Sequence, residues 1–523
     1  MAKRHRALFV FAAALLLTGQ SRMPYGDAVG TARNNDVGAH SHAAVDLEAV
    51  GGSFSAARAL VAQQTRDPKG RSGSNRPLVA YHAGGRKIAG KKAGSTRLFR
   101  TGAIGLEPTL GIDRSGNIYT NVFPEVVVTG AGVATTVYRT RDGARFDDVG
   151  PKVAGTSSHQ YTEDPYLFVD PDTGRVFHND LIFPCQQTTT SDDRGESWSE
   201  AVANCDQADH QTLFAGPPPA GGVTPIGYRN VVYDCAANGG ALAGPSSTTT
   251  SCDKSLDGGR TFVPTGSPPY MVDPVRYQEA FCDGVTGHGV VGDDGTVYLP
   301  RGHCGQPFVA ISRDEGATWQ RVQVAANGID SGGSGVGPQV DADHEAAISV
   351  DARGNLYYLW VAHDYKPYLA VSRDHGAHWS RPLMVAPPGV RESALPSIAV
   401  APHAQPGHVA LAFMGATDTP AKPYPRDDGH YGRVTWNGYI VETVDALAKN
   451  PTFYGAPIND PLDPLVKGMC APVRCQAEYD FIDVQVSRAG QPWAVFIDAC
   501  LGEKCGALGE SVVATVSGGL KLT

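Results

Sequence analysis

The chain has 523 residues, of which 41% are hydrophobic, and its 62 glycines and 37 prolines are typical of a turn-rich globular protein with a large core. Its formal net charge of −9 argues against the clustered positive surface by which proteins bind nucleic acid. Its apolar runs are too short to span a bilayer comfortably, which argues against a membrane anchor.

The N-terminus has the pattern of a secretory signal. Three basic residues, Lys3, Arg4 and Arg6, precede an uncharged run over residues 7–19. We expect residues 1–21 to be a signal peptide and the protein to be secreted into the extracellular space. Residues 22–98 have weak periodicity and many Gly, Ser and Lys residues, which predicts a partly disordered N-terminal extension.

Three segments predict β-hairpins that open similar structural units. Each has an apolar strand, a turn with Asp and Gly, and a second strand. The segments are residues 109–119, 166–177 and 347–357.

A second motif, Ser-x-Asp-x-Gly-x-Thr-Trp, is repeated without gaps. Full copies occupy residues 191–198, 255–262, 312–319 and 372–379, and a shortened copy occupies residues 140–146. This is the Asp-box pattern. The aspartates are expected to accept hydrogen bonds from turn amides while the following glycine adopts a backbone that other residues resist. We assign a structural role to these aspartates and expect the aromatic residues to be buried beside the turns. The residues concerned are Asp193, Asp257, Asp314 and Asp374, with Trp198, Phe262, Trp319 and Trp379.

Joining the two motifs gives a four-stranded unit, most complete over residues 344–386. Four antiparallel strands per repeat predict an all-β propeller over residues 99–523, and the N-terminal extension would partly close its ring. Similar strand openings recur about seven times, so we expect seven blades, with six as the alternative. The openings lie near Glu107, Glu163, His210, His288, His344, Glu392 and Glu478.

Ten cysteines lie between Cys185 and Cys505, and export favours disulfides. Nearest-neighbour pairing is the simplest connectivity, although the last four cysteines could exchange partners or bind zinc. The expected pairs are Cys185 with Cys205, Cys235 with Cys252, Cys282 with Cys304, Cys470 with Cys475, and Cys500 with Cys505.

Asp-boxes on a propeller resemble the sialidase superfamily, and the resemblance runs coarsely from Phe99 to the C-terminus. It implies a secreted glycoside hydrolase of exo-sialidase type that acts on extracellular carbohydrate without a cofactor. Non-catalytic binding propellers also carry Asp-boxes, so binding of a glycan or protein is the alternative function. The sugar, the linkage and the oligomeric state are left open.

The resemblance implies specific site residues. Phe99-Arg100-Thr101-Gly102 stands where sialidases have Phe-Arg-Ile-Pro, whose arginine is one of three that hold the substrate carboxylate. Arg301 and Arg391 are the expected companions of Arg100.

The resemblance also implies a nucleophile and its base. Tyr479 stands at the position of the family's nucleophile, and Glu392 would be its base, because a free tyrosine is protonated at neutral pH. The family's acid/base aspartate has no counterpart in residues 120–136, where Glu125 is the only carboxylate.

A further set of candidates follows from the propeller geometry, because residues at the starts of inner strands converge on the central funnel. Three histidines with several carboxylates suit a divalent metal or an acid/base pair, which gives a metal-dependent polysaccharide lyase as a second alternative. Solvation of a polar channel mouth explains the same pattern without chemistry. Asp341 and Asp343 favour Ca²⁺ among the metals. The candidates are Glu107, Glu163, Asp164, His210, His288, His344, Glu345, Glu392, Glu478 and Asp480.

Overall fold

The computed structural model shows only β-strands as regular elements in the residues that it describes. These residues are 75–122, 136–152, 162, 164–182, 185–205, 209–237, 249–271, 286–303, 306–325, 346–362, 364–418, 435–467, 482–501 and 504–523.

Five antiparallel sheets of four strands follow one another along the chain. The first contains β3 (Leu110–Ile112), β4 (Ile118–Asn121), β5 (Val137–Thr140) and β6 (Asp147–Asp148). The second contains β7 (Pro165–Val169), β8 (Val176–Ile182), β9 (Cys185–Ser191) and β10 (Val202–Asn204). The third contains β11 (Asp209–Gly216), β12 (Val231–Ala237), β13 (Thr250–Ser255) and β14 (Val263–Pro264). The fourth contains β15 (Val290–Val291), β16 (Val297–His303), β17 (Gln306–Ser312) and β18 (Gln320–Gln323). The fifth contains β19 (Ala347–Val350), β20 (Leu356–Val361), β21 (Pro367–Ser372) and β22 (Leu383–Met384).

A ten-stranded sheet combines the C-terminal strands with two strands from the N-terminal part of the chain. In spatial order it contains β23 (Glu392–Ala399), β24 (Val409–Ala416), β25 (Thr435–Thr443), β26 (Thr452–Pro457), β1 (Arg76–His82), β2 (Arg86–Gly105), β30 (Lys504–Ser517), β29 (Pro492–Leu501) and β28 (Asp483–Val486), and β27 (Val466–Lys467) pairs with β25. Residues 76–82 and 86–98, which the sequence analysis places in the N-terminal extension, therefore lie in strands of this sheet.

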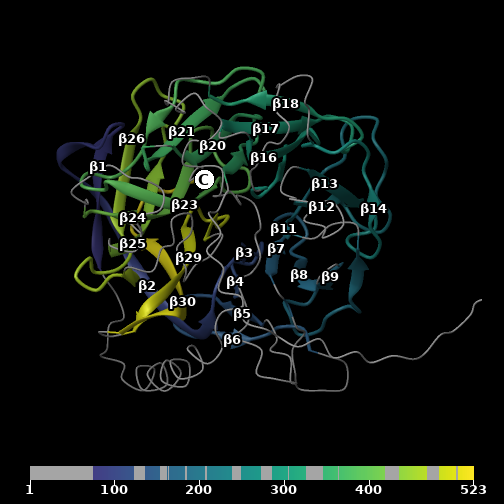
Figure 1. The fold of residues 1–523 in the computed structure, drawn as a ribbon, viewed down its shortest axis with the longest axis horizontal. Helices are drawn as coiled ribbons and strands as arrows, with labels where there is room; N and C mark the ends of the chain where they lie inside the picture. The colour runs from purple at the N-terminus through teal and green to yellow at the C-terminus, as the bar shows by residue number, and fades with distance from the viewer. Residues whose placement is uncertain are drawn as a thin grey trace, which may run out of the picture. The chain divides into compact units, whose positions relative to one another are not determined.

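The first strands of the sheets contact one another in a closed series. β3 contacts β7, and the series continues through β11, β15, β19, β23 and β28 back to β3. In Figure 1 the labels of β7 and β11 lie toward the middle of the view, and those of β9 and β14 lie toward the rim. This arrangement is a β-propeller, as predicted, and residues 344–386 contain the predicted four-stranded unit, β19–β22.

The hydrophobic core lies between neighbouring sheets. One cluster joins Tyr298 and Val309 of the fourth sheet to Ile348 and Tyr358 of the fifth. The Asp-box aromatics extend this packing, since Trp198 packs against the cluster that contains Val149 and donates from Nε1 to the Val149 carbonyl at 2.7 Å. The box aromatics are half-buried rather than fully buried, because each covers the outer margin of the core between two sheets.

The Asp-box turns have the predicted hydrogen bonds. Asp374 Oδ1 accepts from the backbone N of His378 at 2.8 Å, and Gly376 N donates to Ser372 Oγ at 2.9 Å. Two contacts from His378 lower the pKa of Asp374 to about 2. The first is the hydrogen bond from the His378 backbone amide, and the second is the His378 ring Nδ1, which lies 2.6 Å from Asp374 Oδ2. Gly195 shows why glycine is required, because its φ is +86° and a Cβ there would lie 2.7 Å from Val149 Cβ. These contacts support the structural role assigned to the aspartates.

Two of the predicted disulfides are present. Cys185 bonds to Cys205 within the second sheet, and Cys235 bonds to Cys252 across β12 and β13 of the third. The backbones of Cys500 and Cys505 face each other in β29 and β30, and their disulfide stays a prediction. Cys282, Cys304, Cys470 and Cys475 lie outside the described residues.

No helix in the described ranges is long and apolar enough to cross a membrane.

Two buried carboxylates face each other across β12 and β13, next to the Cys235–Cys252 disulfide. Asp234 and Asp253 are paired in register, and Asn204 Nδ2 of the neighbouring sheet donates to Asp234 at 3.1 Å and to Asp253 at 2.7 Å. Burial, reinforced by the nearby Asp253, raises the pKa of Asp234 to about 7, against the opposing hydrogen bond from Asn204.

This pKa predicts a stability change with pH. Between about pH 4 and pH 7 the folded state keeps a proton on Asp234 that the unfolded state has lost, so stability falls as pH rises through that window. Asp234→Asn should flatten this slope in chemical denaturation midpoints measured at several pH values, whereas Glu200→Gln, which removes an exposed carboxylate, should not. An unchanged slope in Asp234→Asn would contradict the assignment.

Candidate functional site

Arg100 is held inside the ten-stranded sheet by two carboxylates of its own chain. Its Nη1 lies 2.6 Å from Glu510 on the adjacent strand β30, and its Nη2 lies 2.6 Å from Asp498 on β29, one strand further along the sheet. Burial alone would lower the pKa of Arg100, but Asp498 and Glu510 outweigh it and raise the pKa. Both Nη groups are therefore engaged without a ligand, and the role of Arg100 in substrate binding stays a prediction.

Arg301 also makes its contacts within the protein. Its side chain on β16 is fully buried, donates from Nη1 to Thr250 Oγ1 at 2.8 Å, and lies 5.3 Å from the ring centroid of Tyr270. Substrate would reach Arg301 only after a rearrangement. Arg391 differs, because it is exposed beside Glu392 at the start of β23.

Charged residues from three strand ends lie near one another, and we call this group the Glu392 cluster: Lys366, Arg391, Glu392 and Asp418. Lys366 Nζ donates to the Arg391 carbonyl at 3.0 Å, and its charge lowers the pKa of Glu392, the first residue of β23. Asp418 follows β24 and accepts hydrogen bonds from Thr435 N at 3.1 Å and Thr435 Oγ1 at 2.9 Å. The cluster thus joins the fifth sheet to the first strands of the ten-stranded sheet.

Glu392 has the electrostatics of an acid or base that works near neutral pH. It is 3% exposed, and burial raises its pKa to about 7, with Lys366 lowering it and Asp418 raising it further. A carboxyl group with this pKa accepts or donates a proton at physiological pH.

Several predicted site residues lie outside the described residues. They are Tyr479, Glu125, Glu163, His344, Glu345, Glu478 and Asp480, together with Asp341 and Asp343. Their roles stay predictions.

The predicted funnel residues that the structure describes occupy similar places at the starts of inner strands. Glu107 and His210 both have left-handed backbones, with φ of 51° and 50°, and each lies two residues before a threonine that bonds to the next sheet. Thr109 Oγ1 accepts from Leu167 N at 2.9 Å, and Thr212 Oγ1 accepts from Gly289 N at 3.2 Å. Glu107, Asp164 and His210 are buried.

His288 reaches residues of sheets that are not its neighbours in the ring. Its ring lies 4.9 Å from that of Tyr166, on β7, in an edge-to-face arrangement. It also influences Asp483 on β28, since burial raises the pKa of Asp483 and His288 acts to lower it. We call His288, Tyr166 and Asp483 the axial cluster.

Sequence reasoning did not find Lys366, Asp418, Tyr166 or Asp483. Tyr166 opens a predicted hairpin and the other three lie in no motif described above, and each becomes a candidate only through the packing of distant strands. No group of three or more His, Cys, Asp or Glu side chains in the described part of the chain is arranged to hold a metal ion. The predicted divalent metal stays a prediction, since His344, Asp341 and Asp343 lie beyond that part.

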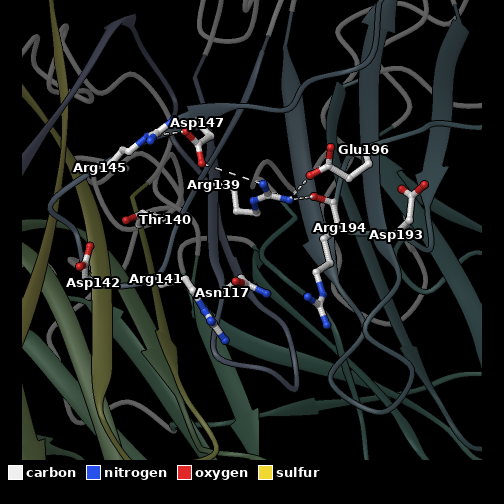
Figure 2. A pocket seen from close by; sticks show the side chains of 10 residues that line it. All are labelled: Asn117, Arg139, Thr140, Arg141, Asp142, Arg145, Asp147, Asp193, Arg194 and Glu196. Carbon is white, nitrogen blue, oxygen red and sulfur yellow. Dashed lines mark hydrogen bonds and ion pairs between the residues drawn. The ribbon is translucent and has the colours of Figure 1, made fainter.

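A separate groove lies between the first two Asp-box turns. It has a volume of about 400 Å³ and is lined by Asn117, by residues 139–147 of the first sheet and by residues 193–196 of the second. Figure 2 shows it as a surface rich in arginine and carboxylate side chains. In these antiparallel sheets the Asp-box turns lie at the opposite ends of the strands from the start of the inner strand, so this groove is separate from the Glu392 cluster.

No family model matches the chain, and no curated protein matches its sequence. Among solved structures, the chain is similar to the NanB sialidase of Streptococcus pneumoniae, with 10% identity, coverage of 80% of this chain and 69% of that chain, and a TM-score of 0.38. It is similar to the intramolecular trans-sialidase of Ruminococcus gnavus, with 13% identity, coverage of 79% and 94%, and a TM-score of 0.38. It is also similar to an α-L-arabinofuranosidase of Fusarium graminearum, with 12% identity, coverage of 68% and 93%, and a TM-score of 0.39. These similarities concern the fold alone, and the propeller assignment rests on the chain's own strand pairing.

The contacts of Arg100 predict a structural effect of its loss. Arg100→Met leaves Asp498 and the fully buried Glu510 without their cation, which should lower the free energy of unfolding by about 3–5 kcal/mol. Urea denaturation measures this, with Arg313→Met, at an exposed arginine, as the matched control. Unchanged stability together with weaker ligand binding would instead identify Arg100 as a ligand contact.

Proposed function

We propose that the protein acts on extracellular glycans as a glycoside hydrolase of sialidase-like type, with Glu392 at the centre of its site. The observation that carries this proposal is the placement of Glu392, which is buried at the start of an inner strand beside Lys366 and Asp418, where burial raises its pKa to about 7. Glycoside hydrolysis uses a pair of carboxyl groups or an activated tyrosine nucleophile, and both need a group that exchanges a proton near neutral pH.

In this proposal Glu392 is the base that takes the proton of Tyr479, the nucleophile implied by the resemblance to sialidases. Asp418 is the second carboxyl group near Glu392, and its hydrogen bonds from Thr435 fix its orientation. Glu125 remains the candidate acid/base residue for the leaving group. The mechanism requires Tyr479 Oη to come within about 3 Å of Glu392.

The surroundings of Glu392 favour an acidic sugar as the substrate. Arg391 is exposed beside it, and Lys366 places a second positive charge near the same carboxyl group. Arginine binds carboxylates in a bidentate manner, so Arg391 would orient a sialic or uronic acid.

We also propose that the propeller has seven blades and is exported. The ten-stranded sheet contributes two inner strands, β23 and β28, and would therefore count as two blades. One blade would contain β23, β24, β25 and β26, the other would contain β28, β29, β30 and β2, and β1 would pair with β26 of the first and β2 of the second. The N-terminal signal pattern supports export, and the two disulfides favour an oxidising compartment.

The axial cluster favours a second candidate, a polysaccharide lyase. A lyase needs a base to remove the proton next to a uronate carboxylate and an acid for the leaving oxygen, and His288 beside Tyr166 supplies both residue types. This candidate differs in its product, which is an unsaturated sugar.

Replacement of Glu392 tests the leading proposal. Glu392→Gln should lower kcat/KM on fluorogenic sialosides or uronides at least about 100-fold, and Tyr479→Phe should act similarly. The wild-type kcat/KM should rise with pH and level off above about pH 7, because Glu392 must be ionised to accept a proton.

The matched control is Glu442→Gln. Glu442 is also buried with a pKa raised to about 7, but it accepts a hydrogen bond from Leu520 N, away from the cluster. Its loss should leave kcat/KM unchanged. Full activity in Glu392→Gln would refute the proposal, and an unsaturated product would transfer the assignment to the axial cluster.

A further inference from the structure

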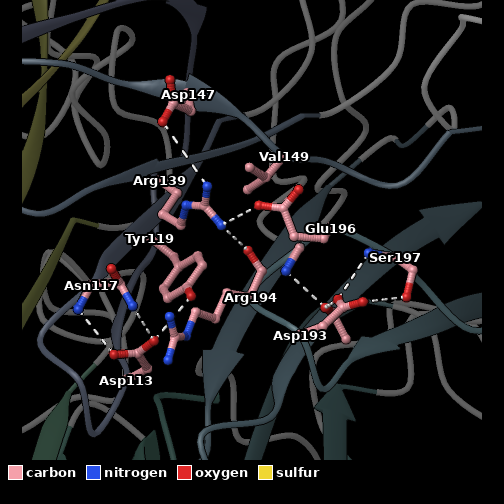
Figure 3. Close-up of polar contacts among 12 residues, drawn as sticks. Asp113, Asn117, Tyr119, Arg139, Asp147, Val149, Asp193, Arg194, Glu196 and Ser197 are labelled. Atoms are coloured by element: carbon pink, nitrogen blue, oxygen red, sulfur yellow. Dashed lines mark hydrogen bonds and ion pairs between the residues drawn. The ribbon is translucent and has the colours of Figure 1, made fainter.

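The groove between the first two Asp-box turns contains some arginines that pair with carboxylates and others that do not. Arg139 belongs to the first group, since its Nη1 lies 3.0 Å from Glu196 and donates to the Arg194 carbonyl at 2.7 Å. Arg145 Nε lies 2.8 Å from Asp147. Figure 3 shows Arg139, on β5, reaching Glu196 and the Arg194 carbonyl of the second turn.

The carboxylate of Asp193 is also satisfied by its own turn. It accepts from the backbone N of Ser197 at 2.8 Å and from Ser197 Oγ at 2.6 Å, and these two bonds lower its pKa. The Asp193 carboxylate is therefore already hydrogen-bonded within its own turn when no ligand is bound.

Two guanidinium groups in the groove have no carboxylate partner among the described residues. Arg194 makes no side-chain hydrogen bond or ion pair there, and Arg141 has only a 3.4 Å contact with the Ser115 carbonyl. Both are exposed, and Figure 2 shows them pointing to the same side of the groove with Asn117 between them.

Asn117 provides a polar floor between these arginines. It is 4% exposed, and its Nδ2 donates to Asp113 Oδ2 at 2.6 Å, which orients the amide. Its Oδ1 accepts no hydrogen bond from the described part of the chain, so it is available to a donor that enters the groove.

Other Asp-boxes show that the free state of Arg194 is unusual. The same turn position holds Glu315, which is buried and bonded to Lys254 Nζ at 2.7 Å, and His375, whose Nδ1 lies 3.5 Å from Asp294. Arg194 has a left-handed backbone, with φ of 69°, which costs a non-glycine residue about 1 kcal/mol. Gly258 occupies that position in the third sheet at no such cost, with φ of 75°.

We propose that this groove binds an acidic sugar residue of a glycan, one that carries a carboxylate or sulfate group. Arg141 and Arg194 would hold the anionic group through charge-assisted hydrogen bonds, and a sugar hydroxyl would donate to Asn117 Oδ1. The site is non-catalytic and separate from the Glu392 cluster. This proposal does not depend on glycoside hydrolysis. Binding at this site would keep the protein attached to an acidic polysaccharide.

The test uses isothermal titration of the full-length secreted protein carrying Glu392→Gln, so that turnover does not disturb the measurement. The probes are a uronic acid oligosaccharide, a neutral oligosaccharide of equal length, and inorganic sulfate. Arg194→Gly should raise the Kd for the uronic acid oligosaccharide at least about 10-fold while leaving thermal stability equal or higher, because glycine suits the left-handed backbone. Arg141→Ala should weaken binding in the same way.

Arg313→Ala is the matched control, because Arg313 follows the serine of another Asp-box as Arg141 follows Thr140. It should leave the Kd unchanged. Equal affinity of Arg194→Gly and its parent for the uronic acid oligosaccharide would overturn the proposal. Binding of the neutral oligosaccharide with equal affinity, or of sulfate as tightly as the oligosaccharide, would overturn the assignment to an acidic sugar.

Discussion

The fold depends on closure of the ring between its first and last inner strands. Leu110 N, at the start of β3, donates to Asp483 Oδ2 on β28 at 3.0 Å, and β2 pairs with β30 along the same junction. Asp483 also lies 3.2 Å from Ser397 Oγ of β23. One buried carboxylate therefore joins three inner strands, and the strand that carries Glu392 is positioned by this closure.

The two ends of the sheets have different chemistry. At one end the Asp-box turns are rigid, because serine, aspartate and glycine satisfy one another within eight residues. At the other end, charged residues from separate strands meet, and Glu392 and Asp483 are buried where desolvation raises their pKa values. The Asp-box turns thus have locally satisfied hydrogen bonds, while carboxyl groups with raised pKa values lie at the starts of inner strands, where functional sites tend to concentrate such groups.

Features set by local sequence were predictable, and features set by distant pairing were not. The hairpin turn of Asp351 and the box turn of Asp374 satisfy their aspartates within six residues, so their motifs predict them. The predicted role of Arg100 in substrate binding stays untested, but its partners Asp498 and Glu510 could not be predicted, because they lie about 400 residues away and meet it only on β29 and β30. Lys366 and Asp418 likewise approach Glu392 from other strands. Glu392 itself was predictable because it opens an inner strand.

The origin of the oxygen in the product tests the central claim most directly. Acidic glycans treated with the purified protein in H₂¹⁸O would be analysed by mass spectrometry. Hydrolysis at the Glu392 cluster predicts one ¹⁸O at the anomeric carbon of the released sugar, and loss of that product in Glu392→Gln. An unsaturated product without ¹⁸O, or the absence of any product across sialosides and uronides, would contradict it.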